Sequence, residues 1–69
     1  MLLVIPVGEM VTVENELEAR VVQISIKKNT IMYEVEKVSE DGISSWWTYD
    51  WQITSKHKKI KVYDLLKRQ

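Results

Sequence analysis

Aromatic residues crowd into one short stretch of the chain. Trp46, Trp47, Tyr49 and Trp51 fall within six residues, and Tyr33 lies on a preceding run that is expected to pair with this stretch. Tryptophan and tyrosine are favoured where one side of a ring is apolar and the other is wet, as at interfaces. A surface of such rings can bind an extended or proline-rich peptide, a cationic group or stacked bases. The alternative is that Trp47 and Tyr33 fill the core, while Trp46 and Trp51 cover the ends of the fold or a dimer contact.

A basic stretch follows the aromatic residues. Its lysines are Lys56, Lys58, Lys59 and Lys61. Lysines beside aromatic rings are the minimal arrangement for binding single-stranded nucleic acid, because the cations follow the phosphates while the rings stack on bases. The alternative is a solvated edge strand, on which lysine prevents edge-to-edge aggregation. The zero net charge of the chain argues against strong nucleic-acid binding.

Catalytic and metal chemistry have little support in this sequence. His57 is the only histidine and there is no cysteine, so no transition-metal site and no cofactor are expected. Ser44 or Ser45 with His57 and Asp50 has the residue types of a hydrolase triad, yet nothing in their spacing fixes the required geometry. The two glycines are far apart, so there is no glycine-rich phosphate loop. An enzyme is therefore the least expected class, and no catalytic residue is assigned.

The length of the chain sets the scale of the fold. Its 69 residues correspond to one domain, residues 1–69, which can bury only a modest core. Without cysteine, packing alone has to stabilise this domain, which suits a reducing compartment. The apolar start is too short for a signal peptide, and no apolar run approaches the length of a membrane helix. A cytoplasmic protein without a membrane partner is expected.

Alternating, β-branched runs predict five strands that would position the aromatic residues. These runs cover residues 10–13, 19–27, 31–38, 43–49 and 59–62. A short helical turn is expected at residues 49–53, before the last strand, and a helical tail at residues 64–69. No apolar residues recur at the three- and four-residue spacing of a helix surface, so an all-β fold is favoured over a helical one.

The alternation also predicts which side chains face the core. The inward residues are Val11 and Val13, then Val22, Ile24 and Ile26, then Ile31, Tyr33 and Val35, then Ile43, Trp47 and Tyr49, with Trp46 on the opposite face of its strand. A tight turn is expected at residues 28–30, where Asn29 tolerates a left-handed backbone. Asp41-Gly42 predicts a type I′ turn, because these two residues accept the positive φ angles that it needs.

The apolar leader of the chain consists of Leu2, Leu3, Val4 and Ile5. If this leader forms a strand, it either completes the fold by burial within the monomer or lies exposed at an edge. An exposed apolar strand invites pairing with another chain. Both possibilities remain open from the sequence, and the second would make the protein a self-assembling subunit.

The order of these features resembles a known small fold. Val22-x-Ile24-x-Ile26 leads through a polar turn to Ile31-x-Tyr33-x-Val35, and Asp41-Gly42, Trp47 and Ile53 follow. This order resembles the SH3-like barrels of the Tudor and chromatin-reader kind, and it is still more similar to the short SH3-like proteins of bacteriophages and prophages. The resemblance covers residues 10–62 and implies a barrel that binds partners. Tudor domains that read methylated residues build an aromatic cage from several strands, whereas here no aromatic residue precedes Tyr33.

These observations predict an all-β fold, a small five-stranded SH3-like barrel with a short helical turn before the last strand. The expected function is that of a non-catalytic interaction module, of phage or prophage origin, that binds a protein or peptide. The partner-binding residues are predicted to be Tyr33, Trp46, Tyr49 and Trp51. The alternatives are nucleic-acid binding through Trp51 with Lys56, Lys58, Lys59 and Lys61, and self-assembly through Leu2, Leu3, Val4 and Ile5.

Overall fold

Strands make up most of the described chain. The computed structural model describes residues 2–62, and the helical tail expected at residues 64–69 lies outside them. The strands are β1 (Leu3–Val4), β2 (Met10–Val13), β3 (Leu17–Lys27), β4 (Thr30–Ser39), β5 (Gly42–Tyr49) and β6 (Ile60–Lys61), and a 3₁₀ turn, η1 (Asp50–Gln52), separates β5 from β6. The all-β prediction is confirmed, and the short helical turn precedes the last strand as expected.

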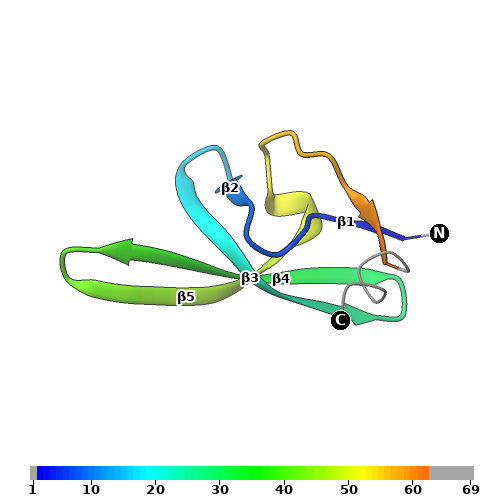
Figure 1. Ribbon diagram of the computed structural model, residues 1–69, viewed down its shortest axis with the longest axis horizontal. Helices are drawn as coiled ribbons and strands as arrows, with labels where there is room; N and C mark the ends of the chain where they lie inside the picture. The colour runs from blue at the N-terminus through cyan, green and yellow to red at the C-terminus, as the bar shows by residue number, and fades with distance from the viewer. Residues whose placement is uncertain (1, 63–69) are drawn as a thin grey trace.

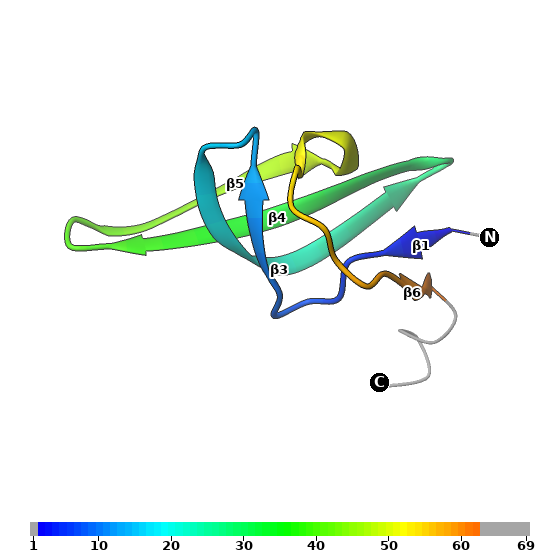
Figure 2. The same cartoon turned by 90° about the horizontal axis from the view of Figure 1, so that it is seen from above.

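Four strands form one antiparallel sheet in the order β2-β3-β4-β5 (Figure 1). Each strand pairs with the next one along the chain, because short turns connect them. Two residues separate the paired strand ends at the turns that follow β3 and β4, which is the shortest common hairpin connection. The β4–β5 hairpin extends beyond the rest of the molecule at its turn, as both views show (Figure 1, Figure 2).

A second, two-stranded sheet joins the two ends of the described chain. β1 pairs antiparallel with β6, with Leu3 opposite Lys61 and Val4 opposite Ile60. Figure 1 shows this pair and η1 on the same side of the four-stranded sheet. An isolated bridge between Val13 and Ile53 links β2 to the segment that follows η1. Within residues 2–62 the two sheets do not close into the predicted five-stranded barrel, because each forms its own ladder.

The core lies on the side of the four-stranded sheet that β1 and β6 cover. Its buried apolar residues are Val4, Ile5, Val11, Val13, Ala19, Val21, Tyr33 and Val35. Fully burying a branched side chain of this size stabilises the fold by about 1.5–3 kcal/mol. The inward facing predicted for β2 and β4 is confirmed, because Val11, Val13, Tyr33 and Val35 are at most 4% exposed.

A β-bulge reverses the facing of β3 partway along the strand. The pairing with β4 shifts between Val21 and Gln23, so Val22 has no partner of its own. Val21 is completely buried and Val22 is half-buried, while Ile24 and Ile26 pack against the core beyond the bulge. The inward prediction is therefore confirmed for Ile24 and Ile26 and wrong for Val22, since one extra residue reverses the alternation.

β5 faces the opposite way from the prediction. Trp46 packs against the core and Thr48 is 2% exposed. The exposed side chains of this strand include Ile43, Trp47 and Tyr49. The cause is the register with β4, in which Trp46 lies opposite the buried Val35. Directly opposed residues of antiparallel strands point to the same face of a sheet, so Trp46 follows Val35 inward.

The two hairpin turns also differ from expectation. Gly42 has a φ of +123°, but Asp41 is not among the residues with positive φ, so this turn is not of type I′. At the other turn Lys28, not Asn29, has a positive φ of +56°. A left-handed conformation costs a residue with a Cβ atom roughly 1–2 kcal/mol. The turn after β3 therefore holds Lys28 in an unfavourable conformation.

The apolar leader is part of the monomer core. Val4 and Ile5 are at most 1% exposed. The backbone N–H of Ile5 donates a hydrogen bond to the Tyr33 hydroxyl at 3.0 Å, which ties the leader to β4. Of the two possibilities for Leu2, Leu3, Val4 and Ile5, burial within the monomer is the one observed, although Leu3 stays 46% exposed. The burial of Val4 and Ile5 therefore removes two of the four apolar side chains that self-assembly through this leader would use.

Candidate functional site

The outer face of the four-stranded sheet, which points away from β1 and β6, carries exposed aromatic rings. Trp47 is 43% exposed and Tyr49 is 40% exposed, and both lie on this face of β5. Met32 of β4 lies opposite Tyr49, and Glu34 lies opposite Trp47. We define the aromatic face as Met32, Trp47, Tyr49 and Trp51.

Trp51 extends this face beyond the end of the strand. It belongs to η1, and its ring stacks on that of Tyr49, with centroids 5.7 Å apart and planes inclined by 10°. The Trp51 side chain is 74% exposed, the largest value among the exposed large apolar residues of the described chain. A tryptophan this exposed in a small domain is typical of a contact with another molecule.

Hydrogen bonds of the Gln52 side chain hold η1, and therefore Trp51, in place. The side-chain oxygen of Gln52 accepts the backbone N–H of Tyr49 at 2.8 Å and the hydroxyl of Thr48 at 3.0 Å. Its amide nitrogen donates to the Glu14 carboxylate at 2.7 Å. These bonds connect η1 with the end of β5 and with the loop after β2. The hydrogen bonds that Gln52 makes with Thr48, Tyr49 and Glu14 therefore hold Tyr49 and Trp51 in place.

Two hollows flank Tyr49 on this surface. One measures about 570 Å³ and is lined by Ser25, Lys27, Thr30, Met32, Trp47 and Tyr49. The other measures about 440 Å³ and is lined by Asn29, Thr30, Ile31, Tyr49, Asp50 and Trp51. They share Tyr49 and Thr30, so the two hollows adjoin one another. Two adjoining hollows beside an aromatic residue suit an extended chain that places one side chain in each hollow.

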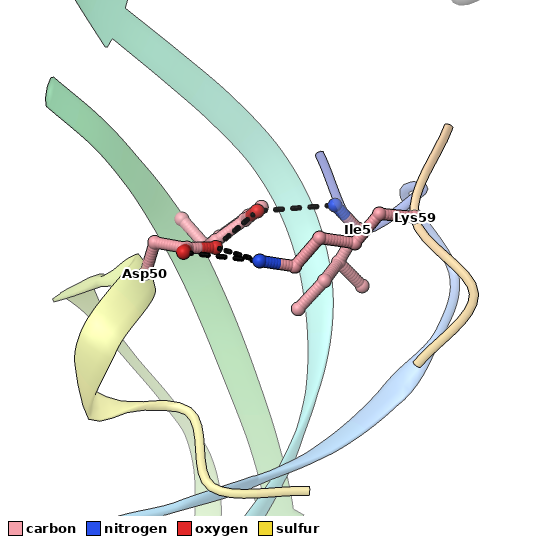
Figure 3. Close-up of polar contacts among 4 residues, drawn as sticks. Ile5, Asp50 and Lys59 are labelled. Carbon is pink, nitrogen blue, oxygen red and sulfur yellow. Dashed lines mark hydrogen bonds and ion pairs between the residues drawn. The ribbon is translucent and has the colours of Figure 1, made fainter. Parts of the chain in front are cut away.

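Tyr33, which was predicted to contact a partner, lies in the core. Its side chain is completely buried. Its hydroxyl accepts the Ile5 N–H and donates to a carboxylate oxygen of Asp50 at 2.8 Å, as Figure 3 shows. Asp50 is also paired with the Lys59 ammonium group at 3.1 Å. Tyr33 and Asp50 together therefore connect the leader, β4, η1 and the segment that carries Lys59. The buried Tyr33 ring is not available to a partner.

The surroundings of Tyr33 keep its hydroxyl protonated. Burial raises the pKa of the Tyr33 phenol far above its ordinary value of 10.0, and the neighbouring Asp50 carboxylate raises it further. The hydrogen bond from the Ile5 N–H opposes this rise in pKa, but it is the smaller effect. The neutral phenol can then accept from Ile5 and donate to Asp50 at the same time.

The basic stretch and the exposed rings of β5 lie on opposite sides of the four-stranded sheet (Figure 1). The segment that carries Lys56, Lys58, Lys59 and Lys61 lies on the core side of the four-stranded sheet (Figure 1), whereas Trp47 and Tyr49 face away from it. All four lysines are exposed, and Lys59 is bound to Asp50. The cation that does line an aromatic hollow is Lys27.

Residues that could support catalysis or metal binding are dispersed. His57 lies against the Ser55 hydroxyl, which also accepts the backbone N–H of Thr12 at 2.9 Å. Ser44 and Ser45 lie on β5, away from this pair in the sheet. In the part of the chain that the structure describes, no three histidine, aspartate or glutamate side chains gather in a way that could hold a metal ion.

A further hollow of about 600 Å³ lies at the other end of the sheet and is strongly charged. It is lined by Met10, Thr12, Asn15, Glu16, Glu18, Ala19, Arg20, Glu36, Lys37 and Val38. Three carboxylates and two cations line it, and Arg20 lies opposite Glu36 in the β3–β4 register. Because both signs of charge are present, this hollow favours neither an anionic nor a cationic ligand.

The sequence predicts part of the aromatic face correctly. Tyr49 and Trp51 were predicted to contact a partner and are exposed, whereas Trp46, predicted to contact a partner, packs against the core, and Trp47, predicted to face the core, is exposed. Neither Met32 nor Lys27 was predicted as a partner-binding residue. The missing signal is the register of the β4–β5 hairpin: with two residues in the turn, an inward Val35 requires an inward Trp46.

Comparisons with protein families, with curated proteins and with solved structures find no match to this chain. Among residues 2–62, no helix has the length and apolar character needed to cross a membrane. The function proposed for the chain therefore depends on the geometry of its own surface.

Proposed function

We propose that this protein is a non-catalytic interaction module that binds an extended segment of a partner protein on its aromatic face. The observation that carries this proposal is the exposure of three neighbouring rings, Trp47, Tyr49 and Trp51. Exposed aromatic residues of this kind dominate the binding energy of many protein interfaces. Leaving them in water has no benefit for the stability of so small a domain, which argues for a partner.

The shape of the surface suggests how the partner binds. Proline-rich segments adopt an extended helix in advance and dock between aromatic rings, so they lose little conformational entropy on binding. On this protein, an apolar or proline side chain would occupy the hollow on each side of Tyr49. Lys27 at the rim of one hollow would favour a partner segment with an acidic residue beside its prolines.

We further propose that the chain is a variant of the SH3-like barrels, of the short bacteriophage and prophage kind, whose two sheets do not close into one barrel within residues 2–62. The succession of β2 to β5, a 3₁₀ turn and a short last strand supports this assignment, as does the packing of β1 and β6 over one side of the main sheet. SH3-like domains commonly bind extended, proline-rich segments, which agrees with the proposed partner.

The test is a selection from a random peptide library on the immobilised protein, followed by titration of the selected peptides with tryptophan fluorescence. We expect selected sequences to be extended and rich in proline or apolar residues. Trp51→Ala and Trp47→Ala should each weaken binding about tenfold or more, equivalent to about 1.4 kcal/mol. The matched control is Val38→Ala, because Val38 is 70% exposed on the same sheet but lines neither aromatic hollow.

Salt dependence separates this proposal from nucleic-acid binding. A peptide held by aromatic contacts should bind with an affinity that changes little with ionic strength. If a single-stranded oligonucleotide instead quenches the fluorescence with an affinity that falls steeply as salt rises, and Lys56→Ala or Lys58→Ala weakens that binding, the peptide proposal is wrong. A selection that yields no peptide sensitive to Trp47→Ala or Trp51→Ala would also overturn it.

A further inference from the structure

β5 is an edge strand that no other segment covers among residues 2–62. It lies at the end of the four-stranded sheet and pairs with β4 on one side. Its eight residues, Gly42–Tyr49, include no charged residue and no proline. Natural sheets usually protect such an edge with charges, proline, a bulge or a covering segment, because exposed N–H and C=O groups recruit other strands.

The other edge of the same sheet is covered. Along β2, the backbone N–H of Thr54 donates to the Thr12 carbonyl at 2.9 Å, and the N–H of Glu14 donates to the Gln52 carbonyl at 2.7 Å. The N–H of Thr12 itself donates to the Ser55 hydroxyl at 2.9 Å. The segment after η1 therefore satisfies the β2 edge, whereas β5 has no such cover in the described chain.

We propose that β5 pairs antiparallel with β5 of a second copy of this chain, about a twofold axis perpendicular to the sheet. A strand without charge does not repel its own copy, so the same edge can be used by both molecules. The strand extends about 27 Å at 3.4 Å per residue, which is long for an edge strand left without protection.

The distribution of apolar side chains along β5 supports a second copy as the occupant. At the turn end of the hairpin, Val38 and Ile43 lie opposite one another and are 70% and 68% exposed. At the other end, the exposed residues are Tyr49 and Trp51. Antiparallel pairing of two identical strands brings the turn end of one copy beside the Trp51 end of the other. Each exposed cluster then loses water contact on the side that faces the second copy, while its outer surface stays open.

The twofold axis restricts the register. Directly opposed residues must share a face, so the strands can be centred only on a residue opposite its own copy. Centring on Ser45 or on Trp46 pairs seven residues of each strand. Centring on Trp46 pairs residues 43–49 of both copies and so includes Tyr49, whose ring stacks on Trp51. Ile43 then lies opposite Tyr49 of the second copy, and Ser45 lies opposite Trp47 of the second copy. These are apolar or neutral pairs, which favour strand association.

Dimerisation through the edge would join two aromatic faces into one surface. Pairing within the sheet plane leaves the outer face open, so both sets of Trp47, Tyr49 and Trp51 would lie on the same side of one eight-stranded sheet. A partner segment could then contact both copies, which raises its apparent affinity through effective concentration. The dimer itself does not depend on the proposed peptide binding, because it uses the edge of the sheet.

The first test is the mass of the protein as a function of concentration, measured by sedimentation velocity. We expect the mass to rise with concentration toward twice the monomer value of 8.2 kDa. Ser45→Lys should weaken this association at least tenfold, because it places two lysines diagonally across the axis. The matched control is Gln23→Lys, which puts the same charge on the same face of an interior strand and should leave the mass unchanged. Circular dichroism verifies that both variants fold.

The second test measures the register in the full chain, which has no cysteine of its own. An equimolar mixture of the Ser45→Cys and Trp47→Cys variants should form a disulfide-linked dimer under mild oxidation, in greater yield than either variant alone. A protein that stays monomeric at every concentration would overturn the proposal. So would an equal response to Ser45→Lys and Gln23→Lys, growth beyond a dimer, or the absence of the mixed disulfide. If the protein stays monomeric but still binds the selected peptides, the dimer proposal is wrong and the proposed function is unaffected.

Discussion

Replacing Tyr33 with phenylalanine tests the buried contact on which much of the fold depends. The ring keeps its shape and its place between the two sheets, so the change removes only the hydroxyl. That hydroxyl accepts the Ile5 N–H at 3.0 Å and donates to Asp50 at 2.8 Å. It therefore connects the leader, β4 and η1, which are distant in sequence.

The expected loss of stability follows from what the hydroxyl leaves behind. Ile5 is 1% exposed, so its N–H would be buried without a partner, at a cost of about 1–3 kcal/mol. Asp50 keeps its contact with Lys59 and loses a smaller amount. We expect Tyr33→Phe to lower the free energy of unfolding by about 2–3 kcal/mol. For a domain of this size, each kcal/mol shifts the melting temperature by about 4–8 °C.

The assay is urea unfolding followed by tryptophan fluorescence, with thermal melting by circular dichroism. The matched control is Tyr49→Phe, because Tyr49 is 40% exposed on the outer face and a surface change of this kind costs about 0.5 kcal/mol or less. If Tyr33→Phe lowers the free energy of unfolding no more than Tyr49→Phe does, the Tyr33 hydroxyl does not hold the leader in place.

The pH dependence of stability gives an independent measurement on the same pair of proteins. Because the pKa of Tyr33 is raised above its unfolded value of 10.0, the folded state holds its proton more tightly than the unfolded state. This contribution is complete below pH 10 and declines above it, with a limiting slope of about 1.4 kcal/mol per pH unit. The decline should be shallower in Tyr33→Phe. Equal slopes in the two proteins would contradict a buried, protonated phenol.

Three further predictions use the same unfolding assay. Trp46→Ala should cost about 2–4 kcal/mol because Trp46 packs on the core, whereas Trp47→Ala should cost less than about 1 kcal/mol; the reverse order would show that the β5 register is wrong. Lys28→Gly should stabilise the protein by about 0.5–1 kcal/mol, since Lys28 has a φ of +56° and glycine accepts it without strain. An unchanged free energy of unfolding would mean that the Lys28 backbone is not strained in the folded protein. Lys59→Met should change stability by less than about 1 kcal/mol, because the pair with Asp50 is about one-third exposed, and a larger loss would mean that Lys59 neutralises a buried carboxylate.

Much of the fold could be predicted because its strands alternate with a period of two. The runs at residues 10–13, 19–27, 31–38 and 43–49 correspond closely to β2, β3, β4 and β5. Within β2 and β4 the alternation is uninterrupted, so the inward residues were correct. The helical turn expected at residues 49–53 contains η1, and Ile53 at its end packs against the core.

The candidate site was harder to predict because its facing depends on two local irregularities. The extra residue at Val22 reverses the facing of β3, and the turn after β4 sets the facing of β5. A three-residue turn would have placed Trp47 opposite Val35, and the observed two-residue turn places Trp46 there. One residue of register therefore decides which tryptophan a partner can contact.

The amino-acid sequence by itself determined the all-β class, the positions of the main strands and the presence of an aromatic cluster next to η1. These properties are local, since they depend on residues within one strand or turn. Only the three-dimensional structure shows which rings are exposed, that Val4 and Ile5 of the leader are buried, and that β5 has a strand on one side alone among residues 2–62. Those properties depend on how strands distant in the sequence pair and pack, and the energy of that packing is shared among residues that no single run of the sequence contains.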